Sequence, residues 1–247
     1  MRMSQAGNGW AACWLAALIA GLTLPGPASG QQLYAAVGAT TDYVVRGLTR
    51  TQGDAAVQAD AGFVTTRGTS LGAGASTVDL NPGAGASSEF AIHVAQRLRI
   101  NMDMAVDLRL TRYLYPGDID PYPYDYTEMR AGLVFRDVVE LAVAYSPDWS
   151  TFSRTDGFAR GRPALWAEGS ASWPISASTN LTGGVGYADV REHTGQAYVY
   201  YSIGVEWRWR RLTAGLVLVG TDATAERLFG PTRADDRIVG SVIWKIR

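Results

Sequence analysis

Residues 102–114, MDMAVDLRLTRYL, alternate between apolar and polar side chains. An extended chain points successive side chains to opposite faces. One face then carries Met104, Val106, Leu108 and Leu110, and the other carries Asp103, Asp107, Arg109 and Thr111. A helix would instead place Asp103 and Asp107 on the same side as Leu110. The stretch therefore predicts a β-strand with one apolar and one polar face.

The same alternation recurs along the chain after Gln31, for example in residues 88–98 and 197–209. Gly and the turn-forming residues separate these stretches, as expected for many short strands. We predict about twelve strands, within a range of ten to fourteen, near residues 33–45, 55–66, 71–79, 88–98, 102–114, 125–136, 138–146, 163–173, 178–187, 197–209, 211–220 and 236–246.

The connections between these strands alternate between long and short. The long connections are residues 46–54, 80–87, 115–124, 147–162, 188–196 and 221–235, and the short ones are residues 67–70, 99–101, 137, 173–177 and 210. Short periplasmic turns and longer extracellular loops are typical of outer-membrane barrels. The sequence thus predicts an all-β fold, a single antiparallel transmembrane β-barrel over residues 31–247.

The polar face of the predicted strands is charged with both signs. A basic residue facing hydrocarbon would cost about 2–4 kcal/mol at the bilayer midplane, so this face must line the lumen and the apolar face must be outermost. The candidate lumen and rim residues are Asp42, Arg46, Asp60, Glu89, His93, Asp107, Arg109, Glu128, Arg130, Glu140, Glu168 and Glu206. We expect Asp42 and Arg46 to form a structural ion pair near the extracellular rim, with constriction of a pore as the alternative role.

Aromatic residues gather near both ends of the predicted strands. Amphipathic rings prefer the two membrane interfaces, so two aromatic girdles are expected. The long-loop girdle would contain Tyr43, Tyr113, Tyr115, Tyr145, Tyr187 and Tyr198, and the short-turn girdle Phe135, Trp173, Trp207, Trp209 and Trp244.

Residues 1–30 resemble a secretory signal. Arg2 gives a positive start, residues 10–24 are almost entirely apolar or small, and Ala28-Ser29-Gly30 suits a cleavage site. The only cysteine, Cys13, lies inside this segment, so no disulfide is expected in the mature chain. The predicted location is the outer membrane of a Gram-negative bacterium, reached through a cleaved signal.

Charge gives no case for nucleic acid as a partner. The chain has 22 Lys and Arg against 23 Asp and Glu, and the charged fraction is 18%, low against roughly 25% in ordinary soluble domains. The expected partners are the lipid bilayer, the barrel assembly machinery during insertion and a small polar solute.

Residues 41–58, TDYVVRGLTRTQGDAAVQ, predict the first hairpin, with a turn centred on Arg46-Gly47. Asp42 to Gly47, followed by Thr49, Thr51 and Gln58, resembles the opening pattern of the TorF-like conserved hypothetical family of proteobacterial outer-membrane proteins. Residues 75–79 (ASTVD), 113–117 (YLYPG) and 145–148 (YSPD) resemble later segments of that family in the same order, as does Tyr126-Thr127-Glu128 with Gly132. The resemblance implies an outer-membrane barrel and no established activity.

The sequence offers little for catalysis. His93 is expected in the lumen beside Glu89 and Arg97, and His193 lies in a predicted loop near Asp189 and Glu192 without metal-ligand spacing. Outer-membrane lipid hydrolases use a Ser/His pair that faces the lipid, whereas the alternation points His93 inward. We therefore expect no enzyme, no metal and no cofactor, and we expect the acidic loop 115–126 to be a rigid solvated loop.

The leading interpretation is a narrow porin-like channel for small polar solutes. It rests on a mixed-charge lumen in a barrel between the filled eight-stranded kind and the wide channels of 16 to 18 strands. The alternative is a non-conducting structural or binding barrel whose long loops engage a partner, and a lipid hydrolase is the third reading.

Overall fold

The computed structural model of the protein describes residues 31–80, 86–117, 124–154 and 157–246. The predicted signal, residues 1–30, lies outside these ranges, as does the tip of the acidic loop, residues 118–123.

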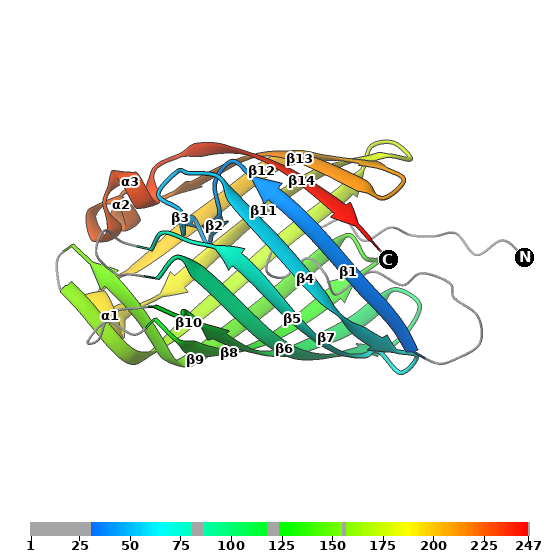
Figure 1. Ribbon diagram of the computed structural model, residues 1–247, viewed down its shortest axis with the longest axis horizontal. Helices are drawn as coiled ribbons and strands as arrows, with labels where there is room; N and C mark the ends of the chain where they lie inside the picture. Colours follow the sequence, from blue (N-terminus) through cyan, green and yellow to red (C-terminus); the bar gives the residue numbers. More distant parts are fainter. Residues whose placement is uncertain (1–30, 81–85, 118–123, 155–156, 247) are drawn as a thin grey trace, which may run out of the picture.

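Twelve strands form a closed antiparallel barrel (Figure 1). Each strand pairs with its neighbour along the chain, and β14 pairs with β1 to close the ring. Closure gives every strand of the ring a partner strand on both sides, as a hydrocarbon environment requires. The predicted fold class and strand number are confirmed. The strands are β1 (Gln31–Thr40), β4 (Ala56–Thr65), β5 (Thr69–Thr77), β6 (Ser88–Arg99), β7 (Met104–Leu114), β8 (Tyr126–Phe135), β9 (Val139–Ser153), β10 (Gly157–Pro174), β11 (Thr179–Asp189), β12 (Ala197–Trp209), β13 (Leu212–Thr221) and β14 (Arg237–Lys245).

The outer face of the barrel is apolar. On β6, Glu89 and His93 expose only 3% and 4% of their surface, while Phe90 and Ile92 expose 44% and 52%. On β12 the exposed side chains are Val199, Tyr201, Ile203, Val205 and Trp207. The prediction that the apolar face is outermost is therefore confirmed.

The aromatic residues divide between the two faces. At the short-turn end Phe135, Trp173, Trp207, Trp209 and Trp244 are all exposed, as predicted. At the long-loop end only Tyr145 and Tyr187 of the predicted girdle are exposed, and the prediction is wrong for the buried Tyr43, Tyr113, Tyr115 and Tyr198. Tyr113 has the parity of Asp107 and Arg109, so alternation turns it inward whatever its height along the strand.

The long connections contain the short helices α1 (Arg191–Thr194), α2 (Ala223–Phe229) and α3 (Pro231–Ala234). Figure 1 places these helices at the end of the barrel opposite the C-terminus. Asp222 caps α2, because its carboxylate accepts hydrogen bonds from the amides of Thr224 and Ala225 at 3.1 and 3.0 Å. No helix in the described ranges is long and apolar enough to cross a membrane.

The hairpin of β9 and β10 is longer than expected. The predicted loop 147–162 is mostly strand, since β9 continues to Ser153 and β10 begins at Gly157. Pro147 and Pro163 lie where the register of the pair shifts, between the partners Ser146↔Ala164 and Trp149↔Arg162. Proline has no N–H for the ladder and is tolerated at such irregularities, so it interrupts the sequence pattern without ending the strands.

The first strand is shorter than predicted. It ends at Thr40, which pairs with Ala56 of β4, and not near residue 45. The intervening residues form a separate small hairpin from β2 (Val44–Val45) and β3 (Leu48–Thr49).

Candidate functional site

The β2–β3 hairpin turns into the lumen at the long-loop end. Its tip is Arg46 and Gly47, with φ of 53° and 79°, which confirms the predicted turn. A Cβ added to Gly47 would lie 2.3 Å from Thr221 Cγ2 and 2.9 Å from Tyr200 Cβ. The tip is therefore pressed against the inner wall at β12 and β13, and only glycine fits there.

Arg46 connects this tip to strands across the lumen. Its Nη1 lies 2.7 Å from Glu128 Oε2 on β8, and its Nε lies 2.9 Å from Glu168 Oε1 on β10. Its guanidinium carbon is 3.9 Å from the centre of the Trp166 ring. The Tyr198 hydroxyl donates to the Arg46 carbonyl at 3.2 Å. Charge-assisted bonds of this kind are among the stronger ones in a buried setting, so the hairpin is held across the lumen.

Asp42 has a different ion partner from the one expected. Its Oδ2 lies 2.6 Å from Arg237 Nη1 on β14, and its Oδ1 accepts hydrogen bonds from the Thr49 and Thr51 hydroxyls. The predicted Asp42–Arg46 pair is therefore wrong. The prediction placed both on one strand face, but the chain leaves β1 at Thr40 and the two side chains diverge.

A tyrosine cluster surrounds Glu89 at the same end. The Tyr43 and Tyr115 hydroxyls donate to its two carboxylate oxygens at 2.9 and 2.5 Å. Tyr113 stacks on Tyr126 with 4.5 Å between ring centres. These rings belong to one buried apolar cluster that also includes Leu48 of the hairpin and Leu228 and Phe229 of α2. The long-loop end of the lumen is thus packed like a small protein core.

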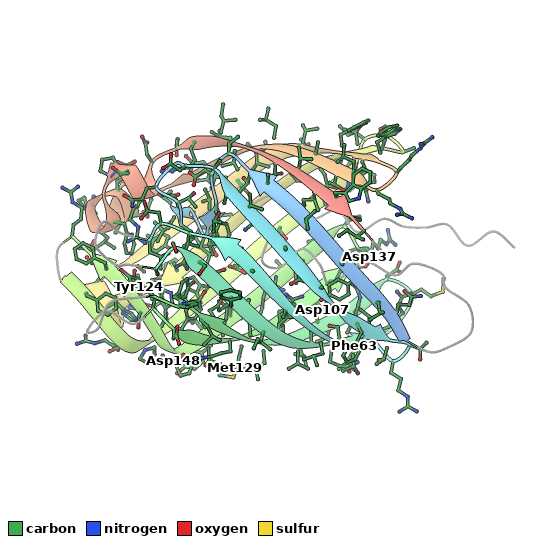
Figure 2. All side chains as sticks on the ribbon, in the orientation of Figure 1. Phe63, Asp107, Tyr124, Met129, Asp137 and Asp148 are labelled. Atoms are coloured by element: carbon green, nitrogen blue, oxygen red, sulfur yellow. The ribbon has the colours of Figure 1, made fainter. Side chains whose placement is uncertain are left out.

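The short-turn end of the lumen is charged. Figure 2 shows Asp107 and Asp137 there, with Tyr124 at the opposite end. Arg97 contacts Asp137 and lies 3.6 Å from Asp107. Further ion pairs of the inner wall are Arg130–Glu140 at 2.7 Å and Glu206–Arg208 at 3.4 Å. Arg130 also lies 3.7 Å from Glu168 and so connects these charges to the Arg46 network.

His93 is buried on the lumen wall, where its side chain lies near Tyr34 and Asp60. Its Nε2 is 3.1 Å from the Tyr34 hydroxyl, and its Nδ1 is 3.9 Å from Asp60 Oδ2. Gly72 lies beneath the group, because a Cβ there would be 2.3 Å from the Tyr34 hydroxyl and 2.6 Å from His93 Nε2. Arg109 is half-buried on β7, opposite Arg130 of β8 in the ladder.

The predicted lumen residues thus fall into separate groups. One network contains Arg46, Glu128, Glu168, Arg130 and Glu140. Asp60 and His93 form another, and Asp107 and Glu206 each lie beside an arginine. Trp166 was missed, although it shares the parity of Glu168 and alternation alone would have placed it inside. Arg50, Arg233 and Arg237 were missed because they lie outside the regular strand pattern or at its edge.

Within the described ranges no group of three or more metal-ligating side chains comes together. His193 is buried, and its Nε2 lies 3.0 Å from the Arg162 carbonyl, to which it donates.

Comparison with solved structures supports the barrel architecture. The NanC porin matches with a TM-score of 0.55 at 7% identity, covering 86% of this chain and 98% of that one. The KdgM porin matches with a TM-score of 0.53 at 8% identity over the same shares, and a KdgM porin in complex with disordered oligogalacturonate gives 0.54 at 7%. No curated protein matches the sequence.

The sequence also matches a family model over residues 25–246, described as a bacterial protein of unknown function. Because this match spans nearly the whole chain, the protein belongs to the Gcw_chp family.

Proposed function

We propose that this protein is a porin-like channel of the Gram-negative outer membrane for small polar solutes, narrowed near its long-loop end by the β2–β3 hairpin. The observation that carries the proposal is a mixed-charge inner face inside a closed barrel whose outer face is apolar. Cleavage of residues 1–30, insertion by the barrel assembly machinery and the TorF-like resemblance belong to the same proposal.

The similar solved structures support the proposal of a channel at the level of the fold. Both similar barrels are porins, and one was solved with an oligogalacturonate. Folded-in segments that carry charge restrict the solutes that a pore admits. Here Arg46 at the hairpin tip reaches across the lumen to Glu128 on β8 and Glu168 on β10.

Excision of the hairpin tests the proposal. Thr40 and Ala56 are paired, so replacing residues 43–52 with two glycines leaves the β1–β4 ladder intact. We expect small single-channel steps from the folded wild type in planar bilayers and steps several-fold larger from the excised variant. The matched control inserts two glycines after Gly53, where a Cβ would meet nothing within 4 Å, and should behave as wild type. Absence of steps from wild type and variant alike, when both run as heat-modifiable folded barrels, would refute a channel.

The second candidate function is a non-conducting binding barrel whose long loops engage a partner. The packed cluster at the long-loop end favours it, because Tyr43, Leu48 and Leu228 fill that part of the lumen. Steps from the excised variant but none from wild type would support this candidate. Deleting residues 116–124 should then abolish partner binding and leave the folded band on a gel unchanged.

A further inference from the structure

Arg50 is buried at the long-loop end without a described counter-ion in contact. It follows β3 directly and exposes 8% of its surface. Within the described ranges its guanidinium has no hydrogen bond and no carboxylate within 4 Å. Glu89 is the acid in its electrostatic surroundings, but both oxygens of Glu89 accept from Tyr43 and Tyr115.

Arg233 of α3 is a second buried cation in the same region. It exposes 9% of its surface, and its Nη1 donates to the Phe152 carbonyl at 3.3 Å. Its Nε is buried without a hydrogen-bond partner, and its guanidinium carbon lies 5.6 Å from the centre of the Phe229 ring. None of the described carboxylates lies within ion-pair distance of it.

The two arginines are neighbours. Helix α3 packs against β3, which places Arg233 beside the segment that carries Arg50. Burial, followed by the positive charge of Arg50, lowers the pKa of Arg233 to about 10. Tyr124 and Tyr198 lie in the surroundings of Arg233. Two like charges are thus held near each other in a mainly aromatic setting, in which Glu89 is the acid named near Arg50 and no acid is named near Arg233.

Such an arrangement is unfavourable without an anion. An unpaired buried charge is costly, because the group loses its hydration and gains no opposite charge in return. A guanidinium presents N–H donors in a fork that matches the oxygens of carboxylate, sulfate or phosphate groups. An oxyanion between the two arginines would accept from both and remove their repulsion.

We propose that Arg50 and Arg233 form a binding site for a small oxyanion at the long-loop end of the lumen. If the protein is a channel, this site implies that its solute is an anion, and only this conclusion rests on the proposed function. Binding itself does not require conduction, so the two ideas fail separately.

Calorimetric titration of the folded protein in detergent tests the site. The probes are succinate and sulfate, each added at constant ionic strength set with sodium chloride. We expect saturable binding to wild type and a loss of about tenfold or more in affinity in both Arg50→Gln and Arg233→Gln. Arg233→Lys keeps the charge but not the fork and should retain part of the affinity. The control is Arg227→Gln in α2, which is exposed and donates to the Thr224 hydroxyl.

Each result of these titrations either supports or overturns the proposed anion site. Binding of succinate alone assigns a carboxylate solute, and equal binding of sulfate assigns oxyanions in general. Absence of saturable binding to folded wild type overturns the site, as does binding that both glutamine variants leave unchanged. Asp118, Asp120 and Asp156 lie outside the described ranges, so the Asp118→Asn/Asp120→Asn/Asp156→Asn triple variant is also titrated. If only that variant binds, the chain supplies its own counter-ions and the proposal is wrong.

Discussion

Arg46 combines an unfavourable backbone with a favourable side-chain environment. Its φ of 53° lies in the left-handed region, which costs a residue with a Cβ roughly 1–2 kcal/mol. Its two carboxylate partners, Glu128 and Glu168, are themselves buried. The ion pairs of Arg46 with these two carboxylates offset the cost of its backbone conformation.

Replacing Arg46 with Gln is expected to release the hairpin. Glu128 would then be buried without its described cation, and Glu168 would keep Arg130 at 3.7 Å as its described cation. Removal of one partner of a buried pair costs about 3–5 kcal/mol. We expect a lower urea midpoint for unfolding from vesicles and larger conductance steps. Arg191→Gln, at an exposed pair with Asp189, should change neither. Wild-type behaviour of Arg46→Gln would mean that the network does not hold the hairpin.

Gly72 provides a second test at the level of one residue. Alanine at this position places a Cβ 2.3 Å from the Tyr34 hydroxyl and 2.6 Å from His93 Nε2, so the cluster must shift. We expect a loss of about 1–3 kcal/mol in unfolding free energy, the range for overpacking. Gly183→Ala serves as the control, because its Cβ would lie 3.5 Å from the Ser202 carbonyl. Equal unfolding free energies of the two variants would show that the barrel wall at Gly72 accommodates the added methyl group without cost.

Among the elements, the connections at the long-loop end are built unlike ordinary loops. The β2–β3 hairpin and α2 both contribute to the buried cluster, and α1 packs against β9 and β10. Long loops with buried side chains are ordered by the same apolar contacts as a core. These segments therefore belong to the packed lumen and not only to the surface.

Helix α1 should loosen at acidic pH. Burial lowers the pKa of His193 below its usual 6.5, and its Nδ1 is buried without a hydrogen-bond partner. The imidazole of His193 therefore binds a proton less readily in the folded state than in the unfolded state. The stability that the neutral His193 side chain contributes is complete above about pH 6.5 and declines as the pH falls below it.

The fluorescence of Trp149 reports this change, since its ring centre lies 5.0 Å from that of His193. We expect Trp149 emission to change between pH 7 and pH 5 in wild type, with a much smaller change in His193→Gln. The His93→Gln variant is the control for the other histidine, and its Trp149 emission should change with pH as in wild type. An identical profile in wild type and His193→Gln would exclude His193 as the group that titrates.

For the molecule as a whole, the defining property is that polar and apolar faces are inverted relative to a soluble barrel. Buried carboxylates and arginines lie inside, and side chains such as Ile203 and Leu141 are exposed outside. An apolar exterior of this extent is stable only in hydrocarbon or detergent.

Adjacent positions on β12 test the inversion directly. Ile203 exposes 55% of its surface on the outer face, and Ser202 lies half-buried on the lumen side. Ile203→Arg should lose about 2–4 kcal/mol of folding free energy in vesicles, as expected for a basic residue near the bilayer midplane. Ser202→Arg should lose much less, because its charge meets the polar lumen. A larger loss of unfolding free energy in Ser202→Arg than in Ile203→Arg, measured by urea unfolding, would contradict a membrane-spanning barrel.

The sequence alone determined the barrel. Strand number, strand order and the apolar outer face all follow from period-2 alternation, because a strand has only two faces and a closed antiparallel ring needs only neighbouring pairs. Residues 102–114 carried this information without any tertiary contact.

Only the tertiary structure decided what fills the barrel. Contacts such as Arg46 with Glu128 and Glu168, or Asp42 with Arg237, join positions far apart in the chain, and strand parity cannot specify which inward side chains meet across the lumen. The inward hairpin and the buried Arg50 and Arg233 lie in connections that have no periodic pattern. Parity determines the face on which a residue lies, but its partner depends on how the long connections fold into the enclosed space.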